Sequence, residues 1–141
     1  MLTEKTPGLL EGLTPATRAA ALRWAELAAA EGLTLTLTSG RRSAVQQAKA
    51  MLAKVARGED LYRLYRSAGD TLDRLFAAPR DIDAWAWVLD DEPISAHQEG
   101  EAVDARRWGM TEAQLYRLGE LAIAAGFRRA LLESDHLHAQ M

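Results

Sequence analysis

The most restrictive feature of the sequence is the strict alternation of leucine and threonine over residues 33–38, LTLTLT. Successive side chains of a strand point to opposite faces, so the leucines share one face and the threonines the other. This period of two predicts a half-buried strand. The chain must therefore build a sheet with one apolar face, and other segments must cover that face.

Three stretches carry the signals of helices. Each combines an N-cap residue, apolar residues at helical spacing and a glycine that ends the helix. They are residues 14–31 with Thr14 as cap and Gly32 as stop, 44–56 with Ser43 and Gly58, and 111–127 with Thr111 and Gly126.

The segment between the second and third helices is less regular. Residues 61–76 predict a further helix, which Gly69 and Asp70 are placed to interrupt. Its expected buried positions are Leu61, Leu64, Tyr65, Leu72, Leu75 and Phe76. Residues 78–93 fit either a short helix or an irregular loop. We expect three of the four tryptophans to be packed in the core or against a cleft wall: Trp24, Trp85 and Trp87.

Three short segments predict the remaining strands. They are residues 101–105, 128–133 and 136–140, the last two joined at Ser134–Asp135. With no repeat, low-complexity tract or linker, the sequence predicts one domain over residues 1–141. Its expected class is α+β, a small antiparallel sheet flanked by helices.

Composition excludes several functions. The chain has 141 residues, 48% of them hydrophobic and 26% charged, which is typical of a soluble globular protein. It has no cysteine, which rules out disulfides and thiolate zinc sites. The net charge of −3 argues against nucleic-acid binding. No apolar run is long enough for membrane insertion, and the first residues lack a signal-peptide pattern, so we expect a cytoplasmic product.

The three histidines mark the candidate site. His97 and Asp104 are seven residues apart, and Gly100 between them permits a sharp turn that brings the two side chains together. His136 and His138 share a face of their strand. Two imidazoles and a carboxylate suit Zn²⁺ and leave a fourth position for water, whose pKa the metal lowers to about 7. A nearby carboxylate would serve as general base.

Three motifs resemble those of a known family. SGRRSAVQQ, SAHQEGEAVD and DHLH are similar, in this order, to motifs of the zinc D-Ala-D-Ala carboxypeptidases and L-alanyl-D-glutamate endopeptidases. The second motif fits S-x-H-x-x-G-x-A-V-D at every specified position. The resemblance spans residues 33–140 and implies the hedgehog/DD-peptidase fold. It departs at Arg41, where the family has a tyrosine.

The resemblance implies a role for each matching residue. The implied zinc ligands are His97, Asp104 and His138. Asp135 corresponds to the general base, with Glu133 as the alternative, while Arg42 and His136 would stabilise the oxyanion. Ser95 and Gln47 correspond to substrate-side or structural residues.

Two functions follow as hypotheses. The first is a zinc peptidase that cuts a stem-peptide amide of bacterial peptidoglycan, either L-Ala-D-Glu or D-Ala-D-Ala, as a phage or prophage endolysin. Such an enzyme is expected to be a monomer that acts on the wall after a membrane-permeabilising phage partner releases it, or as part of a virion. The alternative is a non-catalytic, metal-binding module of the same fold that binds the cell wall.

Overall fold

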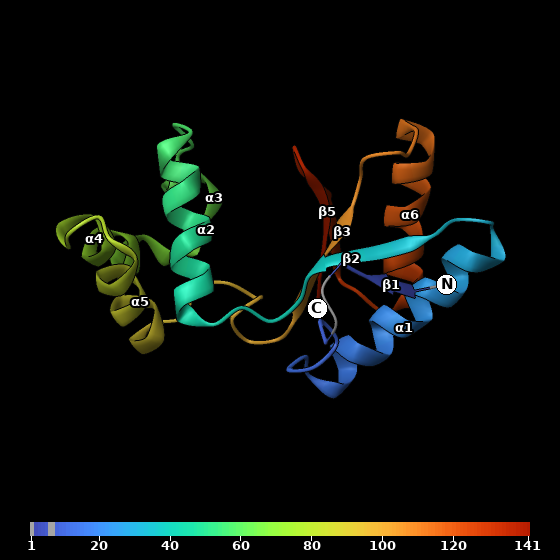
Figure 1. The fold of residues 1–141 in the computed structure, drawn as a ribbon, viewed down its shortest axis with the longest axis horizontal. Helices are drawn as coiled ribbons and strands as arrows, with labels where there is room; N and C mark the ends of the chain where they lie inside the picture. The colour runs from blue at the N-terminus through green and yellow to red at the C-terminus, as the bar shows by residue number, and fades with distance from the viewer. Residues whose placement is uncertain (1, 6–7) are drawn as a thin grey trace. The chain divides into compact units, whose positions relative to one another are not determined.

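The computed structural model describes residues 2–5 and 8–141, which form two compact units (Figure 1). The first unit consists of Met1–Arg41 and Glu99–Met141, and the second, Arg42–Gln98, is inserted between those halves in sequence. Each unit has its own hydrophobic core. The expectation of one domain over residues 1–141 stays a prediction.

The first unit is built on a five-stranded mixed sheet. Its strands, in spatial order, are β1 (Leu2–Glu4), β2 (Leu35–Ser39), β3 (Ala102–Arg106), β5 (His136–Gln140) and β4 (Arg129–Leu132). The predicted α+β class is confirmed. The sheet is not wholly antiparallel, because β1 pairs in parallel with β2 while the other neighbours are antiparallel. β1 was not predicted, since three residues are too few to show a period of two.

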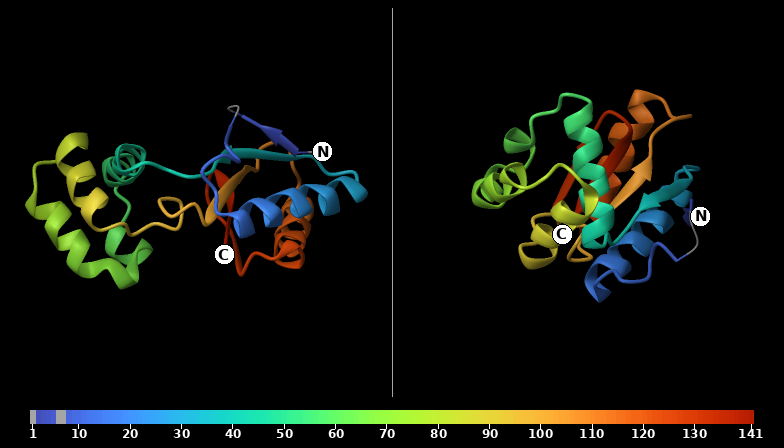
Figure 2. Two further views of the ribbon diagram at one scale, coloured as in Figure 1. Left: turned by 90° about the horizontal axis from the view of Figure 1, so that it is seen from below. Right: turned by 60° about the vertical axis from the view of Figure 1, so that its left-hand side comes forward.

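Two helices cover the leucine face of the sheet (Figure 2). They are α1 (Pro15–Ala30) and α6 (Glu112–Ala125), and their caps are the predicted threonines. The Thr14 hydroxyl accepts a hydrogen bond from the Thr17 amide, and Thr111 forms a reciprocal capping box with Gln114. These caps satisfy amide groups that a helix start leaves without partners.

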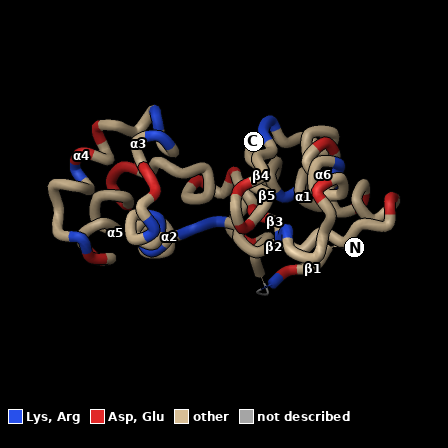
Figure 3. Tube along the Cα trace, turned by 90° about the horizontal axis from the view of Figure 1, so that it is seen from above, with Lys and Arg blue, Asp and Glu red and all other residues tan. Residues whose placement is uncertain are grey.

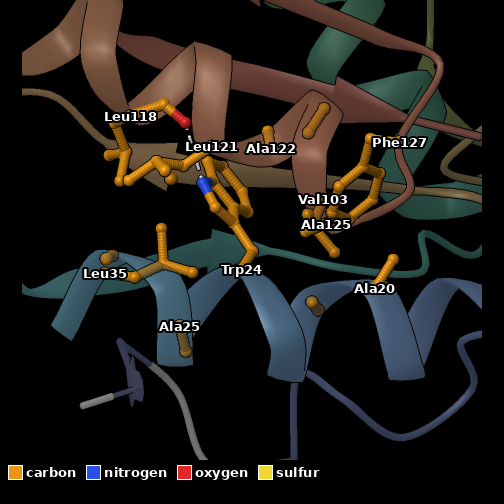
Figure 4. Packing of buried hydrophobic residues seen from close by; sticks show 14 of the residues in the cluster. Ala20, Trp24, Ala25, Leu35, Val103, Leu118, Leu121, Ala122, Ala125 and Phe127 are labelled. Carbon is orange, nitrogen blue, oxygen red and sulfur yellow. Dashed lines mark hydrogen bonds between the residues drawn. The ribbon is translucent and has the colours of Figure 1, made fainter. Parts of the chain in front are cut away.

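The core of this unit forms between the sheet and these helices. Trp24 on α1 is fully buried, and its indole Nε1 donates to the carbonyl of Leu118 on α6 at 2.8 Å (Figure 4). The ring of Phe127 meets that of Trp24 edge to face, with 5.6 Å between the centroids. The predicted packing of Trp24 is thus confirmed, and this hydrogen bond ties the two helices together.

The opposite face of the sheet carries polar side chains, and we call it the site face. Along β3 and β5 the residues packed in the core alternate with the others, so the site face is fixed by the period of two. Its residues on these two strands are Asp104, Arg106, His136, His138 and Gln140.

The second unit is helical. It comprises α2 (Ala44–Ala56), α3 (Leu61–Leu64), a 3₁₀ turn (Arg66–Ala68), α4 (Gly69–Ala77) and α5 (Ile82–Asp91). The bounds of α2 agree with the prediction, and Ser43 caps it. The expected helix over residues 61–76 is broken, because the chain leaves helical geometry at Tyr65 and resumes at Gly69.

Two burial predictions in this unit are wrong. Leu64 is 48% exposed because it ends the short helix α3. Trp85 is fully buried as expected, whereas Trp87 is 77% exposed. Residues two positions apart on an α-helix are separated by about 200° around the helix axis, so Trp85 faces the core and Trp87 faces solvent.

Charge is mixed along the chain: both units carry lysine or arginine together with aspartate or glutamate (Figure 3). Within the described residues, no helix has both the length and the apolar character needed to cross a membrane.

Candidate metal centre

The structure brings together the three side chains that the sequence predicts as metal ligands. One nitrogen or oxygen atom from each of His97, Asp104 and His138 lies within 4.8 Å of the others. His97 and Asp104 are buried, and His138 is half-buried. Such a group could hold a metal ion. Since His138 is 34 residues from Asp104 in sequence, its convergence with the other two residues is a property of the fold.

Asp104 and His138 are placed by strand register. They are directly paired residues of the antiparallel strands β3 and β5, and such pairs have Cβ atoms about 4.5–5.5 Å apart. The Oδ1 atom of Asp104 lies 3.0 Å from Nδ1 of His138. A slip of one residue in this register would move one of them to the core face.

His97 is placed by a turn over residues 95–98. The amide of Gln98 donates to the carbonyl of Ser95, and the amide of His97 donates to the Ser95 hydroxyl. The His97 carbonyl accepts from the amide of Arg42 at 2.9 Å. These bonds give Ser95 a turn-forming contact, and its predicted role toward substrate stays a prediction.

Gly100 makes the bend between His97 and Asp104, as the sequence predicts. Its φ of +71° is one that side-chain-bearing residues rarely adopt. A Cβ atom there would also lie 2.5 Å from the carbonyl oxygen of Gly12. The close approach of the two backbones therefore requires glycine at this position.

Gln140 orients His138 and was not predicted. Its Oε1 lies 2.8 Å from Nε2 of His138, while Nδ1 of the same ring lies 3.0 Å from Oδ1 of Asp104. A partner of this kind fixes the tautomer of a ligand histidine. The signal available in the sequence was the spacing of two residues on one strand, which places Gln140 and His138 on the same face.

His136 lies beside the ligand group. Its Nε2 is 3.4 Å from Oδ1 of Asp104 and also contacts the carboxylate of Glu133. Its Nδ1 lies 2.5 Å from Oδ1 of Asp135. Burial lowers the pKa of His136, but the hydrogen bond with Glu133 and the charge of Asp104 outweigh it, so the pKa lies above its usual value.

The two candidate bases occupy different sides of the His136 ring. Glu133 meets the nitrogen that also faces Asp104, whereas the 71% exposed side chain of Asp135 meets the other nitrogen. Arg107 donates to the carbonyl of Glu133 and so anchors the turn that carries both carboxylates. Arg107 was not predicted from the sequence. The assignment of Asp135 as base stays a prediction.

Gln47 and Arg42 contact each other. The Gln47 side chain is fully buried, and its Nε2 donates to the Tyr65 hydroxyl at 3.2 Å. Its Oε1 accepts from Nη1 of Arg42 at 3.4 Å. Gln47 therefore supports the Arg42 side chain, and the predicted roles of both toward substrate stay predictions.

The donor set fits zinc. Ligand bonds of 2.0–2.2 Å in a tetrahedral site put neighbouring donor atoms about 3.3 Å apart. The 3.0 Å between Asp104 and His138 is close to this value, and no two donor atoms of the group lie more than 4.8 Å apart.

The sequence matches no protein-family model, and no curated protein matches it.

Proposed function

We propose that this chain is a zinc-dependent peptidase that hydrolyses an amide bond in the stem peptide of bacterial peptidoglycan. The observation that carries the proposal is the convergence of His97, Asp104 and His138. Two of the three motifs that imply a zinc peptidase, SAHQEGEAVD and DHLH, contain these same residues. The finer assignment to the hedgehog/DD-peptidase fold rests on that resemblance.

The surrounding residues fit amide hydrolysis. A zinc ion in this site would supply Lewis-acid polarisation of the scissile carbonyl and acidify water. A carboxylate beside it would take the proton of the attacking water and pass it to the leaving amine. A purely structural metal site has no need of Glu133 and Asp135 at its border. Burial lowers the pKa of His136, but Glu133 and Asp104 outweigh this effect and the pKa is raised. His136 could therefore donate a hydrogen bond to the developing oxyanion, together with Arg42.

Two carboxylates compete for the role of base. The resemblance assigns it to Asp135, three residues before His138. Glu133 shares a ring nitrogen of His136 with the ligand Asp104. Whichever carboxylate accepts the proton must come within hydrogen-bond reach of the attacking water.

The biological setting is proposed from the same resemblance. The substrate is the L-Ala-D-Glu or the D-Ala-D-Ala bond, and the enzyme acts as a monomeric endolysin or virion component. It needs neither nucleic acid nor membrane insertion, and a phage protein that opens the membrane would give it access to the wall.

The test is turnover of defined muropeptides, with fragments identified by mass spectrometry. Zinc-loaded protein should cleave one stem-peptide bond, and removal of the metal by a chelator should abolish cleavage. Glu133→Gln and Asp135→Asn should separate the two candidate bases, because loss of the base lowers kcat by about 10²–10⁴-fold.

A different result would support the non-catalytic alternative. Zinc-loaded protein that sediments with purified cell walls but releases no fragment from any muropeptide would overturn the peptidase proposal. Retention of full activity after metal removal would overturn it as well.

A further inference from the structure

Arg106 is an arginine on the site face without an acidic partner. It lies two residues after the ligand Asp104 on β3 and is paired across the sheet with His136. Within the described part of the chain, its guanidinium makes no ion pair, and its buried Nε has no hydrogen-bond partner. The other polar groups nearby, Glu133, Asp135 and Asp104, contact the two histidines of β5 instead. Within the described residues, the positive charge of Arg106 is therefore not balanced by a carboxylate.

Trp108 holds this arginine in place. The guanidinium carbon of Arg106 lies 4.3 Å from the centre of the Trp108 ring, which is a cation–π contact. The indole is nevertheless 71% exposed. Tryptophan and arginine are both enriched among the residues that contribute most to binding a partner.

The position of Arg106 relative to Asp104 limits how far a substrate group bound by Arg106 can lie from the scissile bond. Residues two apart on a strand are separated by about 6.6 Å, given a rise of about 3.3 Å per residue. A substrate group bound by Arg106 would therefore lie within one or two substrate residues of an amide bond that is held beside Asp104. Arginine binds planar carboxylates with two parallel hydrogen bonds.

We propose that Arg106, stacked on Trp108, binds a carboxylate of the substrate near the scissile bond. This inference rests on the proposed function and deepens it, because it names the substrates as stem peptides with a free carboxylate. Two carboxylates have the required chemistry: the α-carboxylate of a γ-linked D-glutamate and the C-terminal carboxylate of the stem. Peptides in which this group is amidated should be poor substrates.

The experiment compares three peptides: the unmodified stem peptide, one amidated at the D-glutamate α-carboxyl group, and one amidated at its C-terminus. For the zinc-loaded wild-type protein, one of the two amidations should lower kcat/KM by about 10- to 100-fold, as expected for loss of a charge-assisted hydrogen bond. The peptide that shows this loss identifies the carboxylate. Arg106→Gln should lower kcat/KM for the unmodified peptide to the same level and leave that for the amidated peptide unchanged.

Matched variants separate this role from charge or folding. Arg129 is an exposed arginine on β4 opposite Gln140, so Arg129→Gln removes the same charge from the same face and should preserve the preference. Arg106→Lys should restore part of it, because lysine keeps the charge but not the paired geometry. An equal loss for all three peptides in Arg106→Gln, or no loss for any, would overturn the inference. If wild-type protein cleaves none of them, the proposed function itself fails.

A binding measurement that requires no turnover completes the test. The metal-free protein is titrated with γ-D-glutamyl-L-lysine, with its α-amide and with its C-terminal amide, while the indole N–H signals are followed by NMR. The Trp108 signal should shift with the dipeptide and with only one of the amides, and should not shift in Arg106→Gln. The signal of Trp87, which lies on α5 and is about as exposed as Trp108, should not shift. A Trp108 signal indifferent to all three would overturn the inference.

Discussion

At the scale of single residues, Gln140 holds the His138 ring in its orientation beside Asp104. Its carbonyl oxygen engages Nε2 at 2.8 Å, which leaves Nδ1 3.0 Å from Asp104. Without this partner the imidazole can turn, and a turned ring removes a candidate ligand from the group. We therefore expect Gln140 to support metal binding without being a ligand itself.

Replacement of Gln140 should therefore weaken zinc binding. We expect Gln140→Leu to raise the Kd for zinc by about 10- to 100-fold, the usual effect of losing an outer hydrogen-bond partner. Competition with a chromogenic chelator measures it, and circular dichroism of the metal-free protein checks the fold. Gln140→Glu keeps an acceptor and should retain tight binding. Equal Kd values for wild type and Gln140→Leu would contradict this role.

Gly100 offers a second prediction at this scale, with Gly32 as its control. Both have positive φ, +71° and +74°, but a Cβ at Gly32 would meet nothing within 4 Å, whereas one at Gly100 would strike the Gly12 carbonyl. Gly32→Ala should cost about 1–2 kcal/mol of stability from backbone strain alone. Gly100→Ala should cost clearly more and also weaken zinc binding, because the bend that brings His97 to Asp104 must shift. Urea denaturation compares the two, and equal losses would refute the argument.

The three ligands could be predicted because the motifs that contain them are local in sequence. Gly100 indicated a turn between His97 and Asp104, and the period of two placed His136 and His138 on one face. The resemblance then implied which three side chains bind the metal. Arg107 could not be found in this way, because it acts through the carbonyl of Glu133, twenty-six positions away. Every residue has a backbone carbonyl, so a contact with one cannot be recognised from the residue type.

At the scale of elements, regular helices were predictable and their irregular neighbours were not. The caps of α1, α2 and α6 fixed their bounds, since a side-chain cap is a local interaction. An interruption of the helix over residues 61–76 was predicted at Gly69 and Asp70, but it begins at Tyr65 and the helix resumes at Gly69. The parallel pairing of β1 depends on the distant strand β2, which propensity does not encode.

The link between α4 and α5 gives a prediction about pH. The Thr71 hydroxyl donates to Glu92 at 2.6 Å, and this bond, followed by the one from Arg74, lowers the pKa of Glu92 below 4.5. A lowered folded-state pKa adds stability above the unfolded value, which is lost as the pH falls through the folded value. Thr71→Val should therefore lower Tm near pH 7, and the difference from wild type should shrink below about pH 4.5.

Thermal melts between pH 3 and pH 7 measure this effect. Thr71→Ser keeps the hydroxyl and should preserve the pH dependence of the wild type. A difference between Thr71→Val and wild type that stays constant across the range would mean that the hydroxyl does not act through the charge of Glu92.

At the scale of the whole molecule, the chain has two separate cores. One lies between the sheet and its helices α1 and α6, and the other among α2, α3, α4 and α5. Leu118 and Leu72 are fully buried leucines, one in each core. Since each core has its own helices and its own apolar contacts, damage to one core has a direct effect only on the elements packed in it.

Truncation of these two leucines measures how far the units are coupled. Leu72→Ala and Leu118→Ala should each cost about 2–5 kcal/mol in the unit that carries it. Hydrogen exchange followed by mass spectrometry should then show faster exchange in α2 and α5 for Leu72→Ala, and in α1 and α6 for Leu118→Ala. The other unit should keep the protection of the wild type, because locally cooperative units open independently. If either substitution speeds exchange equally throughout the chain, the protein unfolds as the single domain that its sequence predicts.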